Sequence, residues 1–204
     1  MSEPAVDSTL KTRAQEALSD DFLRQAVKFT TDRLRGKKRE NTEAFGHWEA
    51  WRERGRQIRQ HTVQHLDYYL DQFSRNVEAL GGHVYFAADA AEAQAIALGI
   101  ARDKQAKLAV KSKSMVSEEL HINDHFGEHG IECLETDLGE WIVQLARETP
   151  SHIIIPAIHK NRFQIKELFE KQGGESLSEE TSVLAGFARR TLRKKFQQAD
   201  LGMT

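Results

Sequence analysis

Two lysines and two serines stand in an unbroken row near the middle of the chain. Ammonium groups, hydroxyl groups and the free backbone N–H groups of a helix start would together suit an anion such as phosphate or carboxylate. The alternative is that the serines cap a helix and the lysines are solvated. Neither the spacing of a P-loop nor the glycine-rich dinucleotide fingerprint is present. The anion-binding candidates of this cluster are Lys111, Ser112, Lys113 and Ser114, and three more, Lys160, Asn161 and Arg162, lie in the third cluster below.

A second polar cluster, ETDLGE at 135–140, holds three carboxylates: Glu135, Asp137 and Glu140. Carboxylates at this spacing could bind a hard cation or act as acid and base. They could equally complement the first turn of a helix that begins near Leu138.

A third cluster combines His159 with Lys160, Asn161 and Arg162. A histidine beside two cations could recognise an anionic or redox partner, and it adds a fourth acid–base candidate to the three carboxylates. The alternative is a helix start capped by Asn161 with solvated charges.

The histidines and the single cysteine give weaker evidence for a metal site than the carboxylates do. His121, His125 and His129 recur every four residues, so on one helix over 115–129 they would share a face and could bind a transition metal. A solvated polar helix face has the same pattern. Cys133 lies in an apolar run and is expected to be a buried, inert thiol. We therefore predict no metal bound by this chain.

Four short apolar runs, at 83–87, 107–110, 131–135 and 152–157, alternate with helical patterns. This alternation predicts an α/β fold with a parallel sheet flanked by helices. The three polar clusters follow three consecutive strands, so parallel order would bring them to one rim of the sheet, where ligands of such folds bind. A further strand is expected where the chain stops at 201–204, and the sheet therefore looks incomplete.

The chain before Gly81 contains no convincing strand. A helix is predicted from Asp20 to Leu34, and apolar residues at steps of three and four predict one long helix over 48–80. We therefore expect a helical N-terminal segment over 1–82 and an α/β domain over 83–204, truncated at its C-terminal end.

Composition excludes several classes of protein. The 204 residues carry 29 basic and 31 acidic side chains, a net charge of −2. This balance, with only short basic runs at 33–39 and 189–195, argues against a nucleic-acid-binding protein. No apolar run approaches the roughly 18 residues of a membrane span. The polar start MSEPAVDSTLK has no secretory pattern, so a cytoplasmic location is expected.

Three ordered motifs carry a family resemblance: KSKSM at 111–115 with Glu118 and Glu119, then ETDLGE at 135–140, then PSHII at 150–154 with PAIHKNR at 156–162. Together they resemble the lactate utilization protein B family, the iron–sulfur subunit of a bacterial system that oxidises L-lactate to pyruvate. The helical segment before them is similar to that family as well.

The resemblance implies a sugar-isomerase or CoA-transferase-like α/β fold, 4Fe–4S clusters, electron transport and other subunits of a lactate-oxidising complex. Family members continue beyond the segment at 199–202 into the rest of the α/β domain and a cysteine-rich, ferredoxin-like part. This chain matches the N-terminal portion and has one cysteine. No cluster ligand carries over to it.

The sequence leaves three hypotheses for the function. The first is a truncated iron–sulfur subunit of L-lactate oxidation that is not catalytic alone. The second is a free-standing α/β domain that binds an anionic metabolite. The third is an enzyme that uses the acid–base candidates. We also expect self-association, because an incomplete parallel sheet exposes a hydrogen-bonding edge and an apolar face.

Overall fold

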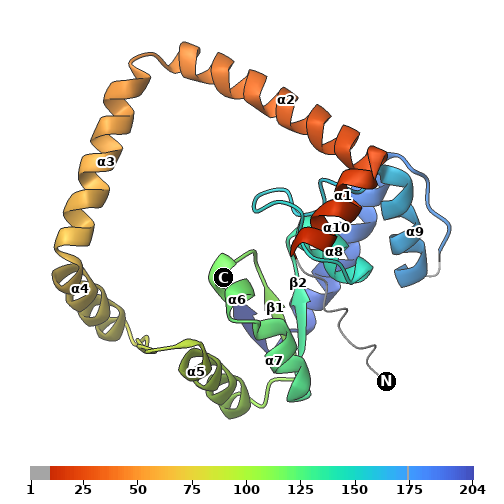
Figure 1. Cartoon of the computed structure of the whole chain (residues 1–204). Coiled ribbons are helices and arrows are strands. Elements are labelled where there is room, and N and C mark those ends of the chain that lie inside the picture. Colours follow the sequence, from red (N-terminus) through yellow and green to blue (C-terminus); the bar gives the residue numbers. More distant parts are fainter. Residues whose placement is uncertain (1–9, 174) are drawn as a thin grey trace. The chain divides into compact units, whose positions relative to one another are not determined.

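The computed structural model describes residues 10–173 and 175–204 (Figure 1). The polar start of the chain, residues 1–9, lies outside the described residues. The chain forms two compact units, and the division falls between Phe86 and Ala87. Within the described ranges, no helix combines the length and hydropathy that crossing a bilayer requires.

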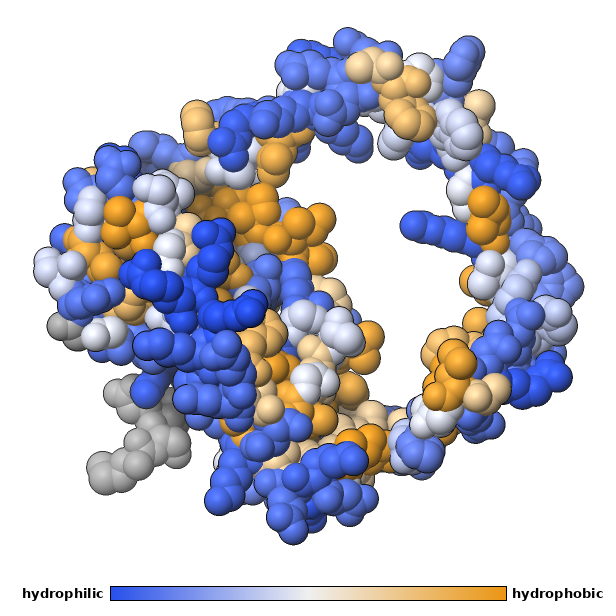
Figure 2. Space-filling view, turned by 180° about the vertical axis from the view of Figure 1, so that it is seen from behind, coloured by the Kyte–Doolittle hydropathy of each residue, from blue (hydrophilic) through white to orange (hydrophobic). Residues whose placement is uncertain are grey.

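The first unit is helical. Its four described helices are α1 (Leu10–Ser19), α2 (Asp21–Phe45), α3 (Trp48–Gln64) and α4 (Leu66–Ala79). No residue of α2, α3 or α4 is buried. Apolar patches therefore interrupt a mostly hydrophilic surface along these helices (Figure 2).

Two expectations for this unit are corrected by the structure. The helix predicted to end at Leu34 continues through the basic run to Phe45, because lysine and arginine are good helix formers. The single helix predicted over 48–80 is interrupted at His65, whose φ of −123° and ψ of 36° are not helical. The His65 N–H bonds to the carbonyls of His61 and Thr62 and closes α3, while its own carbonyl accepts the N–H of Tyr69 in α4.

The second unit contains a three-stranded sheet and six helices among its described residues. The strands are β1 (Leu108–Lys111), β2 (Glu132–Glu135) and β3 (Leu201–Met203). The helices are α5 (Ala90–Asp103), α6 (Met115–Glu119), α7 (Ile122–Glu128), α8 (Leu138–Ala146), α9 (Arg162–Gly173) and α10 (Thr181–Gln198).

The sheet has the order β2-β1-β3, and both pairings are parallel. The predicted α/β class, with a parallel sheet flanked by helices, is confirmed, as are the strands predicted near 107–110 and 131–135. The segment at 201–203 supplies the third strand. The Asp200 carboxylate accepts the N–H groups of Lys107 (2.8 Å) and Leu108 (3.0 Å), which fastens β3 beside β1. These two hydrogen bonds lower the pKa of Asp200.

Two predicted strands are wrong. Residues 83–87 are neither helix nor strand, and the apolar side chains of Tyr85 and Phe86 are exposed and not buried as a core strand would require. Residues 152–157 form a bend followed by a turn that begins at Pro156. There the His152 ring nitrogen Nδ1 accepts the N–H groups of Ile154 (3.0 Å) and Ile155 (3.1 Å), so the backbone donors that a strand would use are already bonded.

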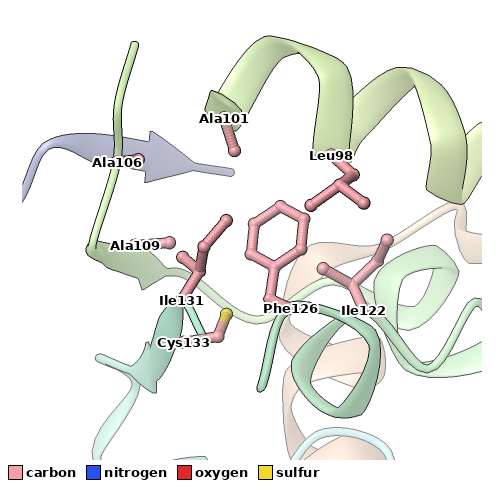
Figure 3. Close-up of a cluster of buried hydrophobic side chains, with 8 residues drawn as sticks. All are labelled: Leu98, Ala101, Ala106, Ala109, Ile122, Phe126, Ile131 and Cys133. Atoms are coloured by element: carbon pink, nitrogen blue, oxygen red, sulfur yellow. The ribbon is translucent and has the colours of Figure 1, made fainter. Parts of the chain in front are cut away.

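Helices cover both faces of the sheet (Figure 1). On one face, Phe126 of α7 is fully buried among residues of α5, β1 and β2, forming the Phe126 cluster (Figure 3). On the other face, Trp141 of α8 packs against Phe169 of α9, with ring centroids 5.1 Å apart, and against Phe187 of α10. We call this second group the Trp141 cluster. The sheet is therefore held rigidly between two cores.

We predict that Phe126→Ala lowers the free energy of unfolding by about 3–5 kcal/mol. The substitution removes a fully buried ring and leaves a cavity that the neighbouring side chains cannot fill. Urea unfolding followed by circular dichroism measures the change. The matched control is Phe163→Ala at an exposed ring, where the loss should be no more than about 0.5 kcal/mol. Equal losses for the two variants would contradict this packing.

We also predict that the chain self-associates. The outer edges of β2 and β3 have no strand partner in the described ranges, and Trp51 and Phe73 are more than half exposed on helices without a buried face. Light scattering coupled to size exclusion should therefore give a mass above the monomer's 23.2 kDa. The Trp51→Glu and Phe73→Glu substitutions should shift the mass downward. A concentration-independent monomer of the unsubstituted chain would contradict the prediction.

Candidate functional site

The first and second polar clusters meet at the carboxyl ends of β1 and β2. Lys111 is the last residue of β1, Glu135 is the last residue of β2, and the parallel register pairs the two directly. Both residues are buried, at 1% and 2% exposure. The sequence pattern predicted all three polar clusters at this rim, where side chains from successive parallel strands collect. The structure brings the first two clusters together there, whereas the third cluster does not follow a strand.

Lys111 is held by three acceptors. Its Nζ lies 2.7 Å from Glu135 Oε1, 2.9 Å from Glu118 Oε1 and 3.0 Å from Ser117 Oγ. Burial acts to lower the pKa of Lys111, but hydrogen bonds and charges from the two carboxylates outweigh it and raise the pKa above its ordinary value. The ammonium therefore stays charged, and all three of its protons are used within the fold.

Glu135 is the most deeply buried of the predicted carboxylates. Its Oε1 also accepts a hydrogen bond from Asn123 Nδ2, at 2.7 Å. Burial raises the pKa of the Glu135 carboxyl even though Lys111 and Asn123 act to lower it. Among the sequence candidates, Glu135 and Lys111 are the two whose burial and charged partners alter the pKa, and such environments concentrate at functional sites.

A second ion pair joins Lys113 to Glu140, which is also buried. The start of α8 positions Glu140, because the Asp137 side chain caps that helix by accepting the N–H groups of Gly139 (3.1 Å) and Glu140 (3.2 Å). Gly139 is required there, since an added Cβ would lie 2.8 Å from Pro156 Cδ. Asp137 thus has the capping role that was the alternative for the second cluster.

The two serines of the first cluster have structural contacts. Ser114 caps α6, with its Oγ 3.4 Å from the Ser117 N–H and its carbonyl accepting the Ser117 hydroxyl. Ser112 donates its backbone N–H to the Met203 carbonyl at 2.8 Å, beside the end of β3.

The third cluster is organised around Glu148. Its carboxylate lies 2.7 Å from His159 Nε2 and also pairs with Lys160 Nζ. Burial acts to raise the pKa of Glu148, but the bonds from Lys160 and His159 outweigh it and lower the pKa. Asn161 caps α9 through the N–H groups of residues 163 and 164, which is the capping role given as the alternative for this cluster. Arg162 lies over the ring of Phe163, 5.1 Å from its centroid.

A cleft of about 820 Å³ opens beside these groups, between α6, α7, α8 and the segment after α8. Three sequence candidates line it: Lys113, Glu135 and Glu140. The remaining candidates do not: Lys111, Ser112, Ser114, Asp137, His159, Lys160, Asn161 and Arg162. Asn123 and Arg147 also line the cleft, although they belong to none of the sequence motifs. No sequence signal marks them, because only folding brings Asn123 to Glu135.

The three histidines do not share a helix face. The helix predicted over 115–129 breaks into α6 and α7, and His121 takes a left-handed conformation with φ of 48° between them. His125 and His129 stay adjacent, with ring centroids 4.7 Å apart. Residues 10–173 and 175–204 contain no group of three or more His, Cys, Asp or Glu side chains placed to hold a metal ion.

The sequence match to a known domain covers this whole site. The family model described as LUD domain matches residues 70–204. The chain belongs to the LUD domain family. It is also 45% identical over 204 residues to lactate utilization protein B of Bacillus cereus (strain B4264), and 44% identical over the same length to that of Oceanobacillus iheyensis. The Macrococcus caseolyticus protein of the same name is 46% identical over 199 residues, or 97% of this chain.

This LUD domain chain spans 43% of the length of the Bacillus cereus and Oceanobacillus iheyensis relatives, and 42% of the Macrococcus caseolyticus relative. No solved structure was found to be similar to it.

The side chains of this LUD domain chain do not fit the 4Fe–4S cluster that the family resemblance implies. A cluster of that kind is held by four cysteine thiolates, and this chain has one cysteine. That residue, Cys133, is buried in β2, and burial followed by the charge of Glu135 raises the pKa of its thiol to about 11. The thiol is buried, as the sequence predicted, and its raised pKa keeps it protonated at neutral pH.

We predict that Lys111→Met lowers the free energy of unfolding by about 3–5 kcal/mol, because it leaves the buried Glu135 carboxylate without its cation. The double variant Lys111→Met/Glu135→Gln should recover most of this loss, since no unpaired buried charge remains at the strand ends. Urea unfolding near neutral pH measures both. A double variant no more stable than Lys111→Met would show that the pair is not the source of the loss.

Proposed function

We propose that this LUD domain takes part in lactate utilization, as the N-terminal portion of an iron–sulfur subunit that works in L-lactate oxidation to pyruvate and in electron transfer. The observation that carries the proposal is the 45% identity, over all 204 residues, to proteins named lactate utilization protein B. Because the chain spans 43% of such a relative, the electron-carrying 4Fe–4S clusters would belong to residues outside this chain.

We propose that the chain is not catalytic by itself and acts with other subunits of a lactate-oxidising complex. All four acid–base candidates support this, because their side chains already have structural partners. Glu135 pairs with Lys111. Asp137 caps α8, Glu140 pairs with Lys113, and His159 pairs with Glu148. A group engaged in this way has limited freedom to exchange a proton with a substrate.

A second candidate function is that of a free-standing domain that binds an anionic metabolite. The cleft of about 820 Å³ favours it, since this volume suits a small molecule. The ion pairs argue against anion binding, because the ammonium groups of Lys111 and Lys113 are already paired with the carboxylates of Glu135 and Glu140. We therefore keep the role in lactate utilization as the main proposal.

The test is genetic complementation in a Bacillus cereus strain that lacks its lactate utilization protein B. A chimera in which this chain replaces the aligned stretch of the Bacillus cereus protein should restore growth on L-lactate. This chain expressed alone should not restore growth, because it lacks cluster ligands. Growth rate on L-lactate, compared with growth on glucose, measures both.

Immunoblotting confirms that the chimera accumulates, and the intact Bacillus cereus protein is the positive control. A chimera with Trp141→Asp, which destroys the Trp141 cluster, is the negative control for an unfolded domain. An abundant chimera that fails to support growth on L-lactate would overturn the proposed function.

A further inference from the structure

Two buried oxygen atoms beside the cleft have no hydrogen-bond partner among the described residues: Glu135 Oε2 and Asn123 Oδ1. The Glu135 side chain is only 3% exposed, and both residues line the cleft. Asn123 donates to the other oxygen of Glu135, so two neighbouring side chains each present a spare acceptor. Buried acceptors without donors are rare and cost free energy, so these two need donors that residues 10–173 and 175–204 do not supply.

The charges around the cleft are strongly unbalanced. Six carboxylate side chains line it, against one lysine and one arginine. The lysine, Lys113, is already paired with Glu140, and the buried Lys111 behind the lining is shared by Glu135 and Glu118. A cleft with one excess sign of charge concentrates ligands of the opposite sign. An anion would meet repulsion here, whereas a cation would be attracted.

We infer that this cleft binds a small organic molecule through a primary ammonium group, which donates hydrogen bonds to Glu135 Oε2 and Asn123 Oδ1. An ammonium has three donors and no acceptor, so it matches a pair of spare acceptors. Its hydrogen bonds to a carboxylate are charge-assisted and stronger than neutral ones. Apolar side chains of the lining, such as Val143 and Ile153, contact the carbon part of the ligand. This inference does not depend on the role in lactate utilization.

Other occupants make different demands on the same atoms. A quaternary ammonium brings the charge without any N–H donor. A hydroxy acid such as lactate brings a donor together with a repelled carboxylate. A divalent metal ion brings the charge and would be coordinated by oxygen atoms alone. Comparing these ligands therefore shows whether binding requires N–H donors or only a positive charge.

The experiment is a titration of the full chain, above neutral pH, with propylammonium chloride, tetramethylammonium chloride, sodium L-lactate and magnesium chloride in turn. The melting temperature and two-dimensional amide NMR spectra are recorded for each. Propylammonium should raise the melting temperature and shift the side-chain amide signals of Asn123. Tetramethylammonium, lactate and magnesium should do neither at equal ionic strength.

Glu135→Gln and, independently, Asn123→Leu should each weaken propylammonium binding by about tenfold, because each removes one acceptor. The control Glu119→Gln removes an exposed carboxylate of the same lining and should leave the affinity within about threefold of the unsubstituted chain. The NMR measurement on the unsubstituted chain keeps the test valid if a variant fails to fold.

Three results would overturn the inference. The first is a folded, unsubstituted chain that does not respond to propylammonium. The second is an equal or larger response to tetramethylammonium, magnesium or lactate. The third is unchanged propylammonium affinity in both folded variants, Glu135→Gln and Asn123→Leu.

Discussion

The buried ammonium of Lys111 constrains the arrangement of the second unit. A charged lysine at 1% exposure is tolerated only where its protons meet acceptors, and here they come from β2 and α6. Glu135 reaches Lys111 because the parallel register pairs the last residues of β1 and β2. A shift of the β1–β2 register by one residue would turn Glu135 to the opposite face of the sheet. The Lys111 ammonium would then be buried among apolar side chains without this carboxylate. The strand register and the electrostatics of the site therefore depend on each other.

The ion pairs and hydrogen bonds of the Lys111 ammonium determine which polar atoms remain unpaired in the cleft beside it. One oxygen of Glu135 accepts from both Lys111 and Asn123, and the other oxygen has no described partner. The cations that the sequence offered for anion binding are used in the same way, since Lys113 is bound to Glu140 and Lys160 to Glu148. What remains at the surface of the cleft is an excess of acceptors and negative charge. Residue types that looked suited to anions thus produce a site suited to donors.

The rigidity of this arrangement comes from the two cores that enclose the sheet. Successive residues of β2 face opposite sides, with Cys133 packed in the Phe126 cluster and Leu134 against the Trp141 cluster. The site lies at the end of the strands between these cores, where backbone and side chains are held from both faces. In the first unit, by contrast, α2, α3 and α4 bury no residue, and their helical form rests on local interactions such as ion pairs three or four residues apart.

Local signals in the sequence determined the α/β class, the strands near 107–110 and 131–135, and the helix caps at Ser114 and Asn161, because each depends on neighbours a few residues away. The motifs likewise identified the family. Only the tertiary structure decided that 83–87 and 152–157 are not strands, that the strand at 201–203 pairs with β1, and that Asn123 and Arg147 line the cleft. Strand pairing and ion pairing both join residues that are far apart in the sequence. A local pattern of residue types does not specify which distant residues come into contact.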